Sequence, residues 1–158
     1  MSFAESPYLV IAGGAFVDES KPEVKELLDA IKKFKIQDKV IFTGFYEDQQ
    51  RYSLLKNSFA FIHLSLYEGF GISVVEAMRS QVPVIVHESD VYKEVVGSAG
   101  IFVDGTREKQ VGEVLFKTLI AETFVQEIAQ RGYERSLGYS WEKTGEITYE
   151  VFKKLCGQ

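Results

Sequence analysis

Two carboxylates, Glu68 and Glu76, lie eight positions apart on either side of the Gly-Phe-Gly sequence at 69–71. A strand-like run precedes Glu68 and an apolar run follows the second glycine, which predicts a strand, a turn and a helix in that order. A helix that begins at such a turn offers unpaired backbone N–H groups that bind anions. Carboxylates accept hydrogen bonds from hydroxyl groups. The combination predicts a ligand that is part phosphate and part hydroxyl-rich, such as a nucleotide sugar.

The elements that must position this turn follow an α/β pattern. Five short runs rich in Val, Ile and Phe show little polar alternation, which is typical of parallel strands buried on both faces. Helical stretches separate them. The order predicts a Rossmann-like, doubly wound parallel sheet of about five strands flanked by helices, with a helical C-terminal segment. The predicted strands are Tyr8–Ala12, Lys39–Thr43, Phe59–Leu64, Pro83–Val86 and Gly100–Val103.

Capping signals mark two of the predicted helices. Ser20 and Glu23 fit a capping box, with Pro22 in the first turn of the first helix. Ser140 is a suitable N-cap for the last helix. The predicted helices after the first are Gln49–Asn57, Ile72–Arg79, Val91–Val96, Glu108–Ile120, Phe124–Ser136 and Trp141–Leu155, the last of which follows Ser140.

Ligands of open α/β sheets bind beyond the carboxyl ends of the strands. Three predicted turns lie at that edge: Gly13-Gly14 after the first strand, Gly44-Phe45-Tyr46 after the second, and Glu68–Gly71 after the third. We therefore expect these three loops to converge on one crevice.

Each of these residues also has a purely structural interpretation. Glu76 could complete a capping box with Ser73 instead of binding a ligand, and the local sequence favours neither. Glu68 could be a solvated loop carboxylate, and the glycines beside it could only supply a tight turn. Gly13-Gly14 lacks a full dinucleotide fingerprint, so a plain turn is the stronger interpretation there.

Composition excludes several other classes of function. The chain of 158 residues has a net charge of −5 and no long basic block, which argues against a nucleic-acid surface. Cys156 is the only cysteine, so a reducing compartment is expected. His63 and His87 lack the spacing of metal ligands and are interpreted as bystanders. The sequence contains no nucleophile elbow, no Walker loop, no signal-peptide pattern and no membrane span.

Taken together, these motifs resemble the C-terminal domain of GT-B-fold retaining glycosyltransferases of family 4, also called group 1. The segment from Glu68 to Glu76 matches the E-x7-E motif of that family, including its Gly-Phe-Gly. Several further segments match in the right order: Tyr8–Gly13 (L-x-I-x-G), Val40–Gly44 (V-x-F-x-G), Glu76–Met78, Pro83–Ile85, Glu94–Val96, Ala99–Val103 and Tyr139–Glu142 (F-S-W-E).

The resemblance implies a role for each predicted site residue. Glu68 would be the catalytic-site residue that contacts hydroxyls of the transferred sugar, and Glu76 would accept from the ribose. Backbone N–H groups of Phe70, Gly71 and Ile72 would hold the sugar and the diphosphate. The loop at Phe45 and Tyr46 would lie against the base, and Gly69, Gly13 and Gly14 complete the donor site. The nucleotide sugar is then the substrate, and no metal or other cofactor is expected.

Departures from the family pattern qualify these expectations. Relative to the family, residues 1–158 correspond to a single Rossmann-like C-terminal domain without its first βα unit, whose Arg and Lys clamp the diphosphate, and without the N-terminal acceptor domain. Leu64 replaces a usual Pro, and Gln81 stands where Gly is common. In the family the strand of the missing unit lies between the first and third strands predicted here. Either these two close up in the sheet order 2-1-3-4-5, which we expect, or another chain fills the gap.

Two functional interpretations remain open on this basis, and a third, a GT-B epimerase, is disfavoured because its site residues are not evident in the sequence. The first is the donor-binding part of a transferase that passes a sugar to a glycan, lipid or other acceptor, as in polysaccharide biosynthesis. This polypeptide would be inactive alone and would lie in the cytoplasm or at the inner membrane face, with peripheral membrane contact in the full enzyme. The second is a non-catalytic binding module or partner subunit. In either case, an open apolar face that includes Ile147, Val151, Phe152 and Leu155 would meet the N-terminal domain or favour self-association.

Overall fold

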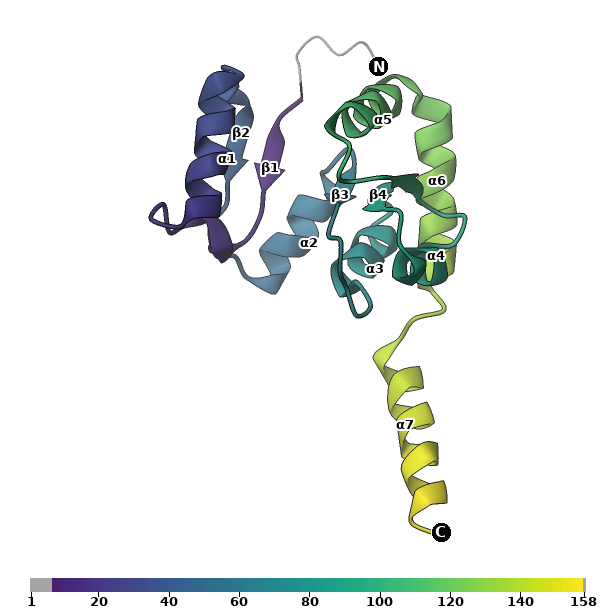
Figure 1. Ribbon diagram of the computed structural model, residues 1–158. Coiled ribbons are helices and arrows are strands. Elements are labelled where there is room, and N and C mark those ends of the chain that lie inside the picture. Colours follow the sequence, from purple (N-terminus) through teal and green to yellow (C-terminus); the bar gives the residue numbers. More distant parts are fainter. Residues whose placement is uncertain (1–6, 158) are drawn as a thin grey trace. The chain divides into compact units, whose positions relative to one another are not determined.

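The structure, a computed structural model, describes residues 7–157 and alternates short parallel strands with helices (Figure 1). The strands are β1 (Leu9–Ile11), β2 (Val40–Phe42), β3 (Phe61–His63), β4 (Val84–His87) and β5 (Ile101–Val103). The α-helices are α1 (Pro22–Lys33), α2 (Asp48–Lys56), α3 (Ile72–Arg79), α4 (Asp90–Val96), α5 (Glu108–Ile120), α6 (Glu122–Ser136) and α7 (Trp141–Leu155), with short 3-10 helices at Gly14–Phe16 and Gln37–Lys39.

The described strands form two parallel sheets, not one. The chain divides into two compact units, one up to Arg51 and one from Tyr52 onward. The first holds the pair β1-β2, and the second holds the sheet β3-β4-β5. The expected closure into the order 2-1-3-4-5 is therefore wrong. Parallel pairing needs a crossover that returns the chain beside the previous strand. Helices α1, α3 and α4 provide such crossovers between paired strands. The expected order would need β1 paired with β3, and no such pair forms among the described strands.

The first unit differs from its sequence pattern in two ways. Ser20 is not the N-cap of α1, because its N–H and hydroxyl both donate to the Asp18 carboxylate, at 3.0 and 2.6 Å. The helix starts one residue later, with Lys21 as an N-cap that makes no side-chain bond and Pro22 in the first turn. The strands β1 and β2 are also mostly exposed, so the prediction of burial on both faces is wrong for this pair.

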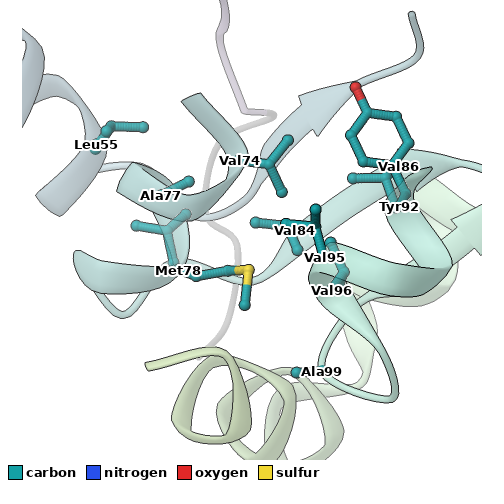
Figure 2. Packing of buried hydrophobic residues seen from close by; sticks show 11 residues of the cluster. Leu55, Val74, Ala77, Met78, Val84, Val86, Tyr92, Val95, Val96 and Ala99 are labelled. Carbon is teal, nitrogen blue, oxygen red and sulfur yellow. The ribbon is translucent and has the colours of Figure 1, made fainter. Parts of the chain in front are cut away.

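The second unit contains the main hydrophobic core. Strand β4 has three fully buried valine and isoleucine side chains and packs against α3 and α6. Burial of each such side chain stabilises the fold by about 1.5–3 kcal/mol relative to exposure. Figure 2 shows the packed cluster, with the Tyr92 hydroxyl pointing away from the valines. The cluster comprises Leu55, Val74, Ala77, Met78, Val82, Val84, Val86, Tyr92, Val95, Val96 and Ala99.

Helix α7 follows the cap predicted for it but buries none of its side chains. The Ser140 hydroxyl accepts a hydrogen bond from the Lys143 N–H at 3.1 Å, which fixes the start of the helix. Its apolar residues, among them Ile147 and Phe152, are all exposed, so the predicted open face is found. Across the described part of the chain, no helix combines the length and apolarity that a membrane crossing requires.

Candidate functional site

The turn between β3 and α3 places an uncapped helix start next to a carboxylate. Helix α3 begins at Ile72, and its N-cap is Gly71, in the left-handed conformation with φ 88°. No side chain caps this end of the helix. The N–H groups of a first helical turn have no partner within the helix, and they carry the positive end of its dipole. This arrangement can bind an anion such as a phosphate.

The second carboxylate of the motif is not a capping residue. Ser73 lies inside α3 and not at its N-cap, so the capping box that Ser73 and Glu76 could have formed is wrong. Glu76 lies one turn further along the helix and is half-buried. Of the two roles that the sequence allowed for Glu76, capping is therefore excluded.

Glu68 pairs with His63, the last residue of β3. The His63 Nε2 group donates to the Glu68 Oε1 atom at 3.0 Å, and the two side chains are 27% and 31% exposed. This hydrogen bond holds the pKa of the Glu68 carboxyl below its usual range. The nearby Ser65 hydroxyl lowers the pKa of Glu68 less than His63 does. It has a single hydrogen, which it donates to the Tyr67 carbonyl oxygen at 3.0 Å. Glu68 is thus not a freely solvated loop residue.

Aromatic rings hold the His63 imidazole in place. Phe61 stacks on it, with ring centroids 5.9 Å apart and planes at 11°, because residues two apart on a strand share a face. Tyr92 of α4 meets the imidazole edge-on at 6.0 Å. Tyr92 also lies against Gly71, where an added Cβ atom would come within 3.0 Å of its ring. The sequence interpretation of His63 as a bystander missed this contact; the only local signal was its place five residues before Glu68.

The buried Tyr92 side chain has an unusual hydroxyl group. The side chain is fully buried, and its oxygen has no hydrogen-bond partner among the described residues. Burial, followed by the charge of Glu68, raises the pKa of Tyr92 to about 12. The hydroxyl is therefore neutral at any physiological pH.

The Gly-Phe-Gly turn is also tied to the segment that precedes α7. The Phe70 ring meets the Tyr139 ring edge-on, with centroids 5.5 Å apart. The Arg79 guanidinium donates to the Tyr139 carbonyl oxygen at 3.1 Å, and the Tyr139 hydroxyl donates to the Val95 carbonyl oxygen at 3.0 Å. Tyr139 thus braces both ends of α3. Sequence reasoning did not assign it this role, because the partners lie 40 or more residues away.

The other predicted donor residues lie together in the first unit. The Gly13 N–H donates to the Thr43 Oγ1 atom at 3.3 Å, and Gly13 forms an isolated bridge with Gly44. The ring of Phe45 covers Gly14, where a Cβ atom would fall 2.3 Å from it. Phe45 is otherwise 86% exposed, and Tyr46 is half-buried. Two of the three predicted loops therefore meet, and their convergence with the turn at Glu68 stays a prediction.

His87 occupies the end of β4 without joining the Glu68 cluster. Its Nδ1 atom accepts a hydrogen bond from the Gly105 N–H at 3.0 Å, which leaves its ring proton on Nε2. Within residues 7–157, no three His, Cys, Asp or Glu side chains gather in a way that could hold a metal ion.

Comparison with known proteins connects this geometry to one family. The family described as "Glycosyl transferases group 1" matches residues 4–135. The O-antigen chain mannosyltransferase B of Escherichia coli is 28% identical over 114 residues, which cover 72% of this chain and 30% of the relative. The chain therefore spans less than a third of the length of this curated relative.

Solved structures share the fold over nearly the whole chain. A sucrose-phosphate synthase from Thermosynechococcus elongatus superposes with a TM-score of 0.82 at 19% identity, covering 94% of this chain and 38% of that one. HepE of Anabaena, solved in complex with UDP-glucose, superposes with a TM-score of 0.80 at 21% identity, covering 96% and 41%. At such low identity these likenesses establish the Rossmann-like fold of GT-B enzymes.

Proposed function

The chain belongs to the group 1 glycosyl transferases as a C-terminal domain, and we propose that it forms the donor-binding half of a retaining enzyme that uses a nucleotide sugar. The observation that carries this proposal is the uncapped start of α3, which lies between Glu68 and Glu76. An anion site with a carboxylate on each side suits a ligand in which a diphosphate joins two polyhydroxylated groups. The complex of HepE with UDP-glucose supports this choice of ligand class.

The geometry suggests a distinct task for each part of this site. The N–H groups of Phe70, Gly71 and Ile72 would bind the diphosphate, whose negative charge increases as the bond to the sugar breaks. Fixed donors aimed at a developing charge are a strong source of catalysis. Glu68 would accept from hydroxyls of the transferred sugar, and Glu76 from the ribose.

The resemblance to the family implies that the loop at Phe45 and Tyr46 lies against the base of the nucleotide, and we propose that role for it. The exposed Phe45 ring offers a flat apolar surface to a base, and Gly14 beneath it lets that ring lie close to the backbone. Gly13 and Tyr46 would lie beside this surface for the base. The donor site also needs no resident metal in this proposal, since backbone N–H groups and the helix dipole would neutralise the diphosphate.

Calorimetry with UDP, GDP, ADP and the corresponding nucleotide sugars tests the proposal directly. We expect one nucleotide and the corresponding nucleotide sugar to bind weakly. Glu76→Ala should abolish the binding of both ligands, and addition of EDTA should not change either affinity. Glu150→Ala on the exposed α7 is the matched control, because it removes the same side chain far along the sequence from the motif. Absence of binding by every nucleotide would refute the proposal and favour a non-catalytic partner module.

The chain covers 38% of the sucrose-phosphate synthase and 41% of HepE, and the resemblance to the family implies that the acceptor site lies on an N-terminal domain of the full enzyme. We therefore propose that the 158-residue polypeptide binds a donor without transferring its sugar. A coupled assay for nucleoside diphosphate release measures this. Robust turnover by the polypeptide alone would show that the acceptor site lies within it.

A further inference from the structure

The contact between His63 and Glu68 has a geometry that an ordinary surface ion pair lacks. Exposed pairs of long, mobile side chains contribute little and hold no fixed orientation. Here the donor is an imidazole that is 27% exposed and stacked on Phe61. The fully buried Tyr92 packs against the same imidazole, with ring planes at 87°. The Nε2–H direction is therefore set by packing, and the Glu68 carboxylate is held by a rigid donor.

We propose that His63 is a positioning residue for donor binding: it fixes the Glu68 carboxylate through Oε1 and leaves Oε2 to accept from hydroxyl groups of the sugar. This inference rests on the proposed function, because it assigns the sugar end of the same ligand to Glu68. An unheld glutamate loses side-chain entropy when it is ordered. A carboxylate that is ordered before the sugar arrives avoids part of that loss.

Tyr92 extends the same positioning to the helix start. Its ring contacts both the imidazole and Gly71, the N-cap of α3. The donor that fixes Glu68 and the N–H groups proposed to bind the diphosphate thus rest on one buried side chain. Tyr92 acts through its ring in this scheme, since its hydroxyl has no partner among the described residues.

The first experiment measures the held carboxylate without any ligand. A carboxyl ¹³C titration of the full chain should place the pKa of Glu68 below its usual range, because His63 donates to the charged form. His63→Leu should move that pKa toward the usual value. His63→Gln, whose amide can donate from a similar position, should retain part of the effect. His87→Gln, at the end of the neighbouring strand, is the matched control and should leave the Glu68 titration unchanged.

The second experiment separates the sugar from the nucleotide. Calorimetry with UDP-glucose and UDP should show that His63→Leu weakens UDP-glucose about 10-fold, the equivalent of one charge-assisted hydrogen bond of about 1.4 kcal/mol. Binding of UDP alone should stay within about 2-fold of the parent. His63→Gln should recover most of the loss, which a purely structural role for the histidine would not predict. GDP and ADP pairs replace UDP if the parent chain prefers them.

The outcomes distinguish this inference from the function on which it rests. If no nucleotide or nucleotide sugar binds the parent chain, the proposed function fails, and the Glu68 titration alone decides whether His63 holds the carboxylate. An unchanged Glu68 titration in His63→Leu overturns the positioning role whatever binds. The positioning role is also overturned if His63→Leu weakens the binding of UDP and of UDP-glucose equally. If His63→Leu does not fold, the same criteria apply to His63→Gln against His87→Gln.

Discussion

Alanine at Gly71 should destabilise the protein, whereas alanine at Gly69, two residues earlier in the same turn, should not. Gly71 has φ 88°, and a Cβ atom there would lie 3.0 Å from the Tyr92 ring. Gly69 has neither constraint: its φ is outside the left-handed region, and no atom lies within 4 Å of an added Cβ. The two variants add the same methyl group, so their difference isolates the backbone conformation and the contact with Tyr92.

The magnitude follows from three contributions. A non-glycine residue in the left-handed region costs about 1–2 kcal/mol. The loss of glycine flexibility in the unfolded chain offsets about 0.4–1 kcal/mol of that. Crowding of a packed side chain adds about 1–3 kcal/mol, and Tyr92 is fully buried and cannot turn away. Gly71→Ala should therefore lose about 3 kcal/mol, the middle of a range of about 1–4.5 kcal/mol. Gly69→Ala should change by less than about 0.5 kcal/mol.

Urea unfolding followed by far-UV circular dichroism measures both values. With a slope of about 1–3 kcal/mol per molar urea, Gly71→Ala should lower the midpoint by about 1 M or more. Equal stability of the two variants would refute the reasoning about Gly71. Binding adds a second readout: if the backbone at Gly69 approaches the donor, Gly69→Ala should weaken nucleotide-sugar binding while its stability is preserved. Unaltered binding would leave Gly69 as a turn residue only.

Other substitutions test further parts of the structure. Gln81 has φ 59° just after α3, so Gln81→Gly should raise the free energy of unfolding by about 0.5–1 kcal/mol in urea, whereas Gln81→Ala should bring no such gain. Tyr92→Phe removes a buried unpaired hydroxyl and should raise stability by about 1 kcal/mol; a loss would show that the hydroxyl is paired. The contribution of the Glu68 carboxylate to stability should be present above about pH 4.5 and disappear as the pH falls through its lowered folded-state pKa, a dependence that His63→Leu should weaken. The exposed face of α7 should cause concentration-dependent association in sedimentation experiments, and Phe152→Asp should abolish it without unfolding the core.

Local sequence patterns predicted the helices and strands better than the residues that cap the helices and the strands that pair. The bounds of α3, α5 and α7 agree with the prediction, because apolar periodicity and nearby breakers specify a helix within its own residues. The predicted capping box at Ser20 was wrong, and the box that Ser73 could have formed with Glu76 does not form. Ser20 fits the pattern but bonds to Asp18, and the turn before α3 is ended by Gly71 instead of Ser73. A cap depends on the backbone angles of the preceding turn, which a three-residue pattern does not specify.

For the site, the sequence alone determined the chemistry of the motif: two carboxylates, a glycine turn and a helix start, in the order that the family shares. Only the tertiary structure decided how these groups are held. His63 orients Glu68 because Phe61 and Tyr92 fix its ring, and Tyr139 braces the turn from a segment about 70 residues later. The division of the strands into two sheets also arises at that level. The physical reason is common to these cases: side-chain contacts and strand pairing depend on segments that meet only after the chain has folded, whereas residue type and spacing are properties of the chain itself.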